Sequence, residues 1–117
     1  MEVCGWGKIS EWNFKSDVKR KATIKINNIR NCGKYSSYSK HPNLSYQLCA
    51  GGQKAVDSCT GDSGGPLMHL KRNAGKVNYY IEGIVSYGPD PCGVEFWPGI
   101  YTRIGNYIEW IERNLKA

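Results

Sequence analysis

The sequence contains no long apolar stretch, since none of its runs approaches the roughly 18 residues that a membrane-spanning helix needs. A secretory signal is also missing, because an acidic residue follows Met1 and no apolar core of about seven residues comes after it. We therefore expect no membrane-spanning segment.

Sequence motifs that bind metals or phosphates are missing too. No Cys-x-x-Cys occurs, and the two histidines, His41 and His69, show no ligand spacing, which argues against a zinc site. The Cys-Gly-Lys-Tyr stretch at 32–35 lacks both the upstream glycine and the following Ser or Thr of a Walker-type phosphate loop. The sequence predicts neither a metal site nor a cofactor.

What the chain does contain indicates one small β-rich domain. Its 117 residues are 40% hydrophobic and include eight Tyr, four Trp and fourteen Gly, which is typical of a globule with many strands and turns and argues against disorder. This length permits a single domain, which we place at 1–117. Five cysteines in so short a chain indicate an oxidising compartment.

The charge is unevenly distributed. Lys and Arg number sixteen against ten acidic residues, and nine of the sixteen fall between Lys8 and Lys40, where only Glu11 and Asp17 oppose them. A basic face attracts heparin-like or other acidic partners. An ordinary solvated face is the simpler interpretation, because the basic residues fall on expected strand exteriors and loops. Without an aromatic-interleaved pattern, we predict no nucleic-acid binding.

The amino-terminal half carries two local patterns. Residues 18–29 alternate imperfectly between apolar and charged side chains, which predicts a half-exposed strand. Residues 34–45 are polar and predict a long loop, which holds the only glycosylation sequon, Asn43-Leu44-Ser45.

The carboxy-terminal half predicts a hairpin and then a helix. Residues 67–70 and 79–86 are apolar enough for two strands, with 71–76 as the turn between them. Asn106, followed three residues later by Glu109, predicts a helix cap. The amphipathic helix after it has one apolar face, formed by Ile108, Ile111 and Leu115.

One stretch, 57–66, carries the chemistry and reads Asp-Ser-Cys-Thr-Gly-Asp-Ser-Gly-Gly-Pro. Ser63 lies among glycines that let the backbone turn sharply, which presents a hydroxyl as a nucleophile. The amides of Gly61 and Ser63 are placed to face one developing oxyanion. Asp62 cannot be the base for its neighbour, because adjacent side chains diverge. On composition alone, a surface turn between two strands explains the stretch equally well.

This stretch resembles the active-site serine segment of trypsin-like (chymotrypsin-fold) serine proteases. The resemblance continues along nearly the whole chain, in matching order and spacing, through Gly5-Trp6-Gly7 and the stretches 47–52, 83–88, 98–103 and 107–111. The sequence of residues 88–93, Gly-Pro-Asp-Pro-Cys-Gly, most resembles that of arthropod clip-domain proteases, the group that contains prophenoloxidase-activating enzymes.

The resemblance implies an all-β fold: the second Greek-key β-barrel of the double-barrel protease fold, with a C-terminal α-helix and the first barrel absent. In the family, the histidine base and its orienting aspartate precede the serine, in that first barrel. Neither segment is present, and the activation cleavage site is missing as well. His69 follows Ser63 along an expected strand at roughly 20 Å, which is out of reach, and His41 is expected to be a solvated loop residue.

The resemblance also assigns roles residue by residue. Ser63 is the acylated nucleophile, with Gly61 and Ser63 forming the oxyanion hole. Asp57 lies at the bottom of the primary specificity pocket, which implies cleavage after Arg or Lys. The remaining assignments are Gly88 and Gly99 as small pocket walls, Ser86 as the serine that buttresses the triad aspartate beside the pocket, and Asp62 as partner of the new amino terminus.

The family pattern pairs Cys32 with Cys49 and Cys59 with Cys92. Each bridge contributes about 2 to 4 kcal/mol in a chain-entropy estimate. Cys4 is left over, as a buried thiol or with its partner in a missing segment.

We therefore expect a fragment of a secreted serine endopeptidase, with protein substrates cleaved after Arg or Lys, serpin-type inhibitors and a missing amino-terminal barrel as its partners. The chain alone is expected to be inactive and aggregation-prone, because its barrel interface is uncovered. The alternative is a catalytically silent, protease-like binding module. Such a binder does not need Asp57, Gly61 and Ser63 together.

Overall fold

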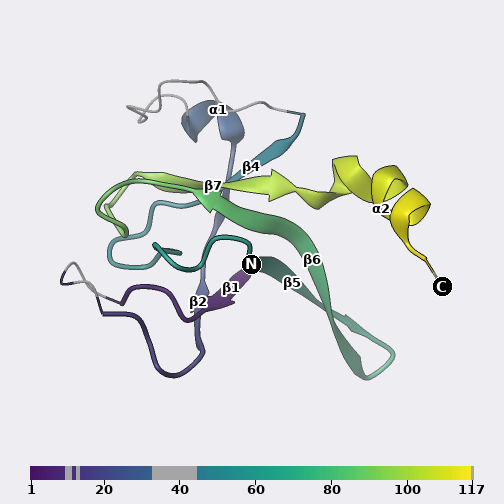
Figure 1. The fold of residues 1–117 in the computed structure, drawn as a ribbon, viewed down its shortest axis with the longest axis horizontal. Coiled ribbons are helices and arrows are strands. Elements are labelled where there is room, and N and C mark those ends of the chain that lie inside the picture. The colour runs from purple at the N-terminus through teal and green to yellow at the C-terminus, as the bar shows by residue number, and fades with distance from the viewer. Residues whose placement is uncertain (10–11, 13, 33–44, 117) are drawn as a thin grey trace.

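The chain folds around a single curled antiparallel sheet that ends in a short helix (Figure 1). The structure is a computed structural model and describes residues 1–9, 12, 14–32 and 45–116. Its elements are β1 (Glu2–Gly5), β2 (Arg20–Thr23), β3 (Ile26–Asn27), α1 (Ile29–Cys32), β4 (Gln47–Gly51), β5 (Pro66–Asn73), β6 (Lys76–Tyr87), β7 (Pro98–Arg103), the 3₁₀ helix η1 (Ile104–Tyr107) and α2 (Ile108–Asn114). The predicted all-β class with a carboxy-terminal helix is confirmed.

The curl of the sheet follows from its strand order, β2-β1-β5-β6-β7-β4-β3. Strands β2 and β3 stand at opposite ends of this order, yet only Ile24 and Lys25 separate them in sequence. The two edges must therefore lie close together, which bends the sheet into a half-barrel. Ile24 is 1% exposed, and its amide donates to the Met1 carbonyl at 2.9 Å. Residues 24–25 thus join the two edge strands of the curled sheet.

The core fills the concave side of this sheet. Alternate residues of the strands point inward, as the two-residue period of a strand requires. The largest cluster consists of Val3, Ile24, Leu48, Ala50, Leu67, Val85 and Tyr101. Full burial of each large member contributes about 1.5 to 3 kcal/mol. A smaller cluster of Cys32, Cys49 and Ile100 lies beside it.

The strand predicted at 18–29 is wrong as a single element. The sheet breaks it into β2 and β3, because Ile24 turns into the core between them, and 29–32 is the helix α1. Val18, the first apolar residue of this stretch, is 63% exposed. The predicted 34–45 loop lies outside the described residues, except for the exposed Ser45 in a turn, and so does Asn43 of the sequon.

The hairpin of β5 and β6 is longer than predicted. Its ladder extends to the pair Asn73↔Lys76, which leaves a two-residue turn, Ala74-Gly75, in place of the expected 71–76. Both turn residues have positive φ, 47° and 76°. Such a turn matches the right-handed twist of the flanking strands, so the hairpin projects as a long twisted ribbon (Figure 1).

The predicted Asn106 cap is also wrong. Tyr107 is the N-cap residue of α2 and makes no side-chain cap bond, while the Asn106 side-chain amide donates to the Ser45 carbonyl. The Asn106 side chain therefore bonds to a segment distant in sequence and does not cap the helix.

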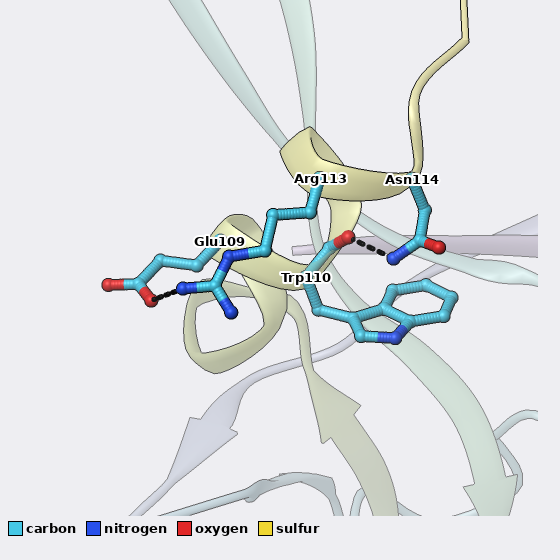
Figure 2. Close-up of polar contacts among 4 residues, drawn as sticks. All are labelled: Glu109, Trp110, Arg113 and Asn114. Atoms are coloured by element: carbon cyan, nitrogen blue, oxygen red, sulfur yellow. Dashed lines mark hydrogen bonds and ion pairs between the residues drawn. The ribbon is translucent and has the colours of Figure 1, made fainter.

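Two side-chain hydrogen bonds within α2 join residues four positions apart (Figure 2). Arg113 donates to the Glu109 carboxylate at 3.3 Å, and the Asn114 side chain donates to the Trp110 carbonyl at 2.7 Å. The helix has no buried residue, and Trp110 is 64% exposed. Leu115 of the expected apolar face follows the helix as its C-cap. No helix in the described part of the chain is long and apolar enough to cross a membrane.

Candidate active site

Ser63 lies in a turn that is fastened to strand β6. The amide of Gly64 donates to the Val85 carbonyl at 3.0 Å, and the Val85 amide returns a bond to Gly65 at 2.9 Å. Within the turn, Gly65 donates to the Asp62 carbonyl at 2.8 Å. The backbone on both sides of Ser63 is therefore fixed while its side chain stays exposed.

The glycines of this turn meet two physical demands. Gly61 and Gly64 have φ of 100° and 83°, in the left-handed region that L side chains rarely adopt. Gly65 is needed for space, because a Cβ there would lie 2.8 Å from the Asp62 carbonyl oxygen. Larger residues at these three positions would strain the turn.

The backbone amides of Gly61 and Ser63, which are predicted to bind an oxyanion, take no part in the hydrogen bonds that close the turns around Ser63. Among the residues that the structure describes, neither the N–H of Gly61 nor that of Ser63 donates a hydrogen bond. Both residues are exposed, and they lie in two consecutive turns, 59–62 and 62–65. Preorganised donors of this kind stabilise negative charge that develops on a carbonyl oxygen.

Asp57 lies at the start of the same segment and is largely buried. Its Oδ2 accepts the Gly93 amide at 3.0 Å, whereas its Oδ1 is buried without a hydrogen-bond partner in the described ranges. Burial raises the pKa of Asp57, and the Gly93 and Ser58 amides oppose this shift only in part. Glycines face the unpaired oxygen, since a Cβ at Gly51 or Gly99 would lie 3.7 or 3.6 Å from it.

The sequence interpretation missed two polar neighbours of this carboxylate. Ser58 Oγ and the Tyr101 hydroxyl share a hydrogen bond of 2.9 Å. Tyr101 is fully buried, and this burial raises its pKa to about 12. The sequence contained a signal that places Tyr101 near Asp57. Tyr101 follows Gly99, a predicted pocket residue, by two positions on β7, so the two residues share one face of the strand.

A disulfide joins the two segments around Asp57. Cys59 and Cys92 are bonded, with their Cα atoms 5.6 Å apart. Beside this bridge, Ala55 donates to the Gly93 carbonyl at 2.8 Å. The second disulfide joins Cys32 to Cys49.

The predicted wall residues lie where β6 and β7 meet. The register shifts between Val85 and Tyr87, so the exposed Ser86 falls at a bulge. Next to it, a Cβ at Gly88 would lie 3.5 Å from the Gly99 Cα. The two glycines allow the backbones to approach closely.

The comparisons with known proteins agree with this geometry. The sequence model of the family described as Trypsin matches residues 1–111. The chain belongs to the trypsin family.

Its similar proteins include arthropod clip-domain proteases. The chain is 47% identical over 115 residues to Melanization protease 1 of Drosophila melanogaster and 42% identical over 116 residues to Phenoloxidase-activating factor 1 of Holotrichia diomphalia. It is also 47% identical over 116 residues to the CLIP domain-containing serine protease HP8 of Bombyx mori. These alignments cover 98%, 99% and 99% of this chain, but only 28%, 30% and 31% of the relatives. The predicted family and its clip-domain branch are confirmed.

A solved structure supports the fold of this trypsin-family chain. Neuropsin, described as a serine protease expressed in the limbic system of mouse brain, has a TM-score of 0.80 and 31% identity. The match covers 98% of this chain and 47% of neuropsin. The half-barrel is therefore a barrel of the trypsin fold, as predicted.

In this trypsin-family chain, Asp62 turns away from Ser63. Its Oδ1 accepts the Gly7 amide at 2.8 Å, and its Oδ2 accepts the Cys59 amide at 2.9 Å. A Cβ at Gly5 would collide with the carboxylate. The carboxylate thus lies against the Gly5-Trp6-Gly7 segment, and both its oxygens accept backbone amides.

Among the residues that the structure describes, no histidine is hydrogen-bonded to Ser63. His69 Nδ1 lies 3.0 Å from Glu82 Oε1 on the β5–β6 hairpin, and His41 lies outside the described residues. In the described ranges the Ser63 hydroxyl has no hydrogen-bond partner, and Cys4 is an unpaired, partly buried thiol. No group of three His, Cys, Asp or Glu residues in these ranges could hold a metal ion.

Proposed function

We propose that residues 1–117 form the carboxy-terminal barrel of a secreted serine endopeptidase that cleaves protein substrates after Arg or Lys. The observation that carries this proposal is the Asp57 carboxylate, whose Oδ1 is buried and has no hydrogen-bond partner in the described chain. An unsatisfied buried acceptor costs about 1 to 3 kcal/mol. A ligand that brings a positive charge and N–H donors to Oδ1 offsets this cost.

The surroundings of Asp57 select a long, slender cation. Gly51 and Gly99 present no side chain to Oδ1, so no side chain from these two positions fills the space beside the carboxylate. A guanidinium or ammonium group reaches it at the end of an alkyl chain and forms charge-assisted hydrogen bonds. Ser58 and Tyr101, hydrogen-bonded at 2.9 Å, add hydroxyl groups to the same region.

The chemistry of the proposed reaction is acyl transfer. The Ser63 oxygen attacks the scissile carbonyl, the leaving amine departs, and water hydrolyses the acyl-enzyme. The amides of Gly61 and Ser63 stabilise the oxyanion. Because an unactivated serine is a weak nucleophile, the reaction needs a histidine and an aspartate from a partner barrel.

The same reasoning extends to location and partners. Two disulfides favour an oxidising, extracellular compartment. The exposed apolar residues of α2, with Trp110 64% exposed, favour coverage by the partner barrel. We infer that the chain alone is inactive and aggregates, and that serpin-type inhibitors engage the intact enzyme through Ser63.

Labelling with an alkyl fluorophosphonate tests the nucleophile. The activated intact protein should be labelled at Ser63, and Ser63→Ala should abolish both labelling and hydrolysis of an Arg p-nitroanilide. Thr60→Ala removes another exposed hydroxyl three residues away and should keep both. An intact protein that is never labelled would contradict the enzyme and favour a silent binding module.

A further inference from the structure

The β5–β6 hairpin has an outer edge that extends beyond the rest of the sheet (Figure 1). Strand β6 pairs with β7 only from Gly83 onward, so residues 76–82 of β6 have no strand on their outer side in the part of the chain that the structure describes. No backbone hydrogen bond from η1 or α2 reaches these residues there. An edge of this kind is a template for pairing with another chain.

The register of the hairpin shows which backbone groups face outward along this edge. In an antiparallel ladder, pairs that exchange both hydrogen bonds alternate with pairs whose N–H and C=O groups point away from the partner strand. A two-residue turn is closed by a pair of the first kind, which here is Asn73↔Lys76. Counting along the register from that pair, the N–H and C=O groups of Val77, Tyr79 and Ile81 point outward.

The side chains of residues 76–82 separate onto two faces, as the two-residue period of a strand requires. Val77, Tyr79 and Ile81 share one face and are 49%, 54% and 53% exposed. The other face carries the exposed cation Lys76 at one end and the partly buried carboxylate Glu82 at the other. The edge is therefore accessible, apolar on one face and oppositely charged at the two ends of the other face.

This edge is complementary to a second copy of itself in one antiparallel register. When Tyr79 faces Tyr79 of the second copy, residues at equal distances on either side face each other. Val77 then faces Ile81 of the second copy, and Lys76 faces Glu82 of the second copy. Each pair of outward-facing residues can exchange both backbone hydrogen bonds.

Other registers lose this match. A shift of two residues places Ile81 opposite the turn residue Gly75, or Val77 opposite Gly83, which already pairs with β7. In both cases Lys76 no longer faces Glu82. A shift of one residue sets outward groups against inward groups, because the pattern repeats every two residues.

We propose that residues 76–82 of β6 are a self-association edge, through which two copies of the protein pair as a symmetric antiparallel dimer centred on Tyr79. A twofold axis makes the interface isologous, so every contact occurs twice. Opposite charges and apolar side chains that face each other across two strands are favourable, whereas like charges are unfavourable. The inference does not depend on the proposed function, because it uses no residue of the Ser63 turn.

Charge exchange tests the pairing by analytical ultracentrifugation of the intact protein. Lys76→Glu sets two carboxylates against each other at both ends of the interface, and should raise the dimer dissociation constant about tenfold or more. Glu82→Lys should do the same with two cations. An equimolar mixture of the two variants should restore dimers, because each lysine again faces a glutamate. This restoration would exclude loss of the Glu82 contact with His69 Nδ1, at 3.0 Å, as the cause.

The matched control for charge is Lys71→Glu. Lys71 is an exposed lysine of the same hairpin, but it lies on β5, away from the free edge of β6. This variant should dimerise like the unmodified protein.

A disulfide tests the register. Residues of a hydrogen-bonded antiparallel pair have Cα atoms about 5.5 Å apart, within the range that a disulfide spans. In a Cys4→Ser background, which removes the unpaired thiol of the described chain, Tyr79→Cys should give a disulfide-linked dimer under mild oxidation. The matched control, Asn78→Cys, changes the adjacent exposed residue, which faces Tyr80 of the second copy, and should link far less.

The outcomes distinguish a second copy from any other occupant of the edge. A monomeric intact protein at micromolar concentration overturns the proposal. If the amides of Val77, Tyr79 and Ile81 are protected from hydrogen exchange in that monomer, another part of the same protein covers the edge. A dimer that Lys76→Glu leaves unchanged has its interface elsewhere, which also overturns the proposal. Equal linking through Tyr79→Cys and Asn78→Cys overturns the register.

Discussion

The substitution Asp57→Asn probes stability and specificity at the same atom. The asparagine side chain would keep an acceptor for the Gly93 amide, which now donates to Oδ2 at 3.0 Å, and would remove the charge from the unpaired Oδ1. The two side chains have nearly the same volume, so packing against Gly51 and Gly99 is preserved.

The sign of the stability change follows from burial. Because burial raises the pKa of Asp57 above its unfolded value, 3.8, the folded protein loses stability as pH rises through the folded pKa of this carboxyl. Asparagine has no such loss. We expect the variant to be about 1 kcal/mol more stable at neutral pH. The difference should shrink toward pH 3.8.

The same substitution, which should raise stability, should lower activity toward Arg and Lys substrates. A hydrogen bond to a charged group contributes about 1.5 to 3 kcal/mol, so kcat/KM for Arg and Lys p-nitroanilides should fall roughly 10- to 100-fold. Hydrolysis of a matched Leu substrate should change little. The exposed Asp17 serves as control, because Asp17→Asn removes a carboxylate that has no hydrogen bond to the pocket.

Two measurements check these expectations on the intact protein. Thermal unfolding between acid and neutral pH compares the Tm of the two proteins, and initial rates compare the three substrates. An unchanged preference for Arg and Lys would refute the pocket assignment. A variant that unfolds at a lower temperature at every pH would refute the argument from the unpaired buried oxygen.

Three other substitutions test the geometry. Ala74→Asn should stabilise the protein by about 0.5 to 1 kcal/mol, because Ala74 has φ of 47° and Asn tolerates the left-handed region; thermal unfolding with Ala74→Val, which should destabilise, is the comparison. Gly65→Ala should cost about 2 kcal/mol or more, since its Cβ would lie 2.8 Å from the Asp62 carbonyl oxygen, and near-normal urea unfolding would contradict this. Tyr101→Phe should cost about 1 kcal/mol in the same assay, because it removes the partner of the Ser58 hydroxyl.

Local chemistry determined what the sequence showed by itself. The glycines around Ser63 predict a tight turn, because only glycine adopts the backbone of Gly61 and Gly64 readily. Strand and turn residues likewise predict the β5–β6 hairpin, though not its length. These features depend on conformational preferences of neighbouring residues, which are visible in a sequence.

Tertiary structure decided the features that join distant residues. Ser58 bonds to Tyr101 across 43 positions, and Gly7 bonds to Asp62 across 55. The Asn106 side chain, expected to cap α2, donates instead to the Ser45 carbonyl, 61 positions away. No local pattern encodes such pairs, because they form only when the curled sheet brings the segments together. The sequence by itself thus determined the serine turn and the strand-rich class, and only the fold decided which groups surround Asp57.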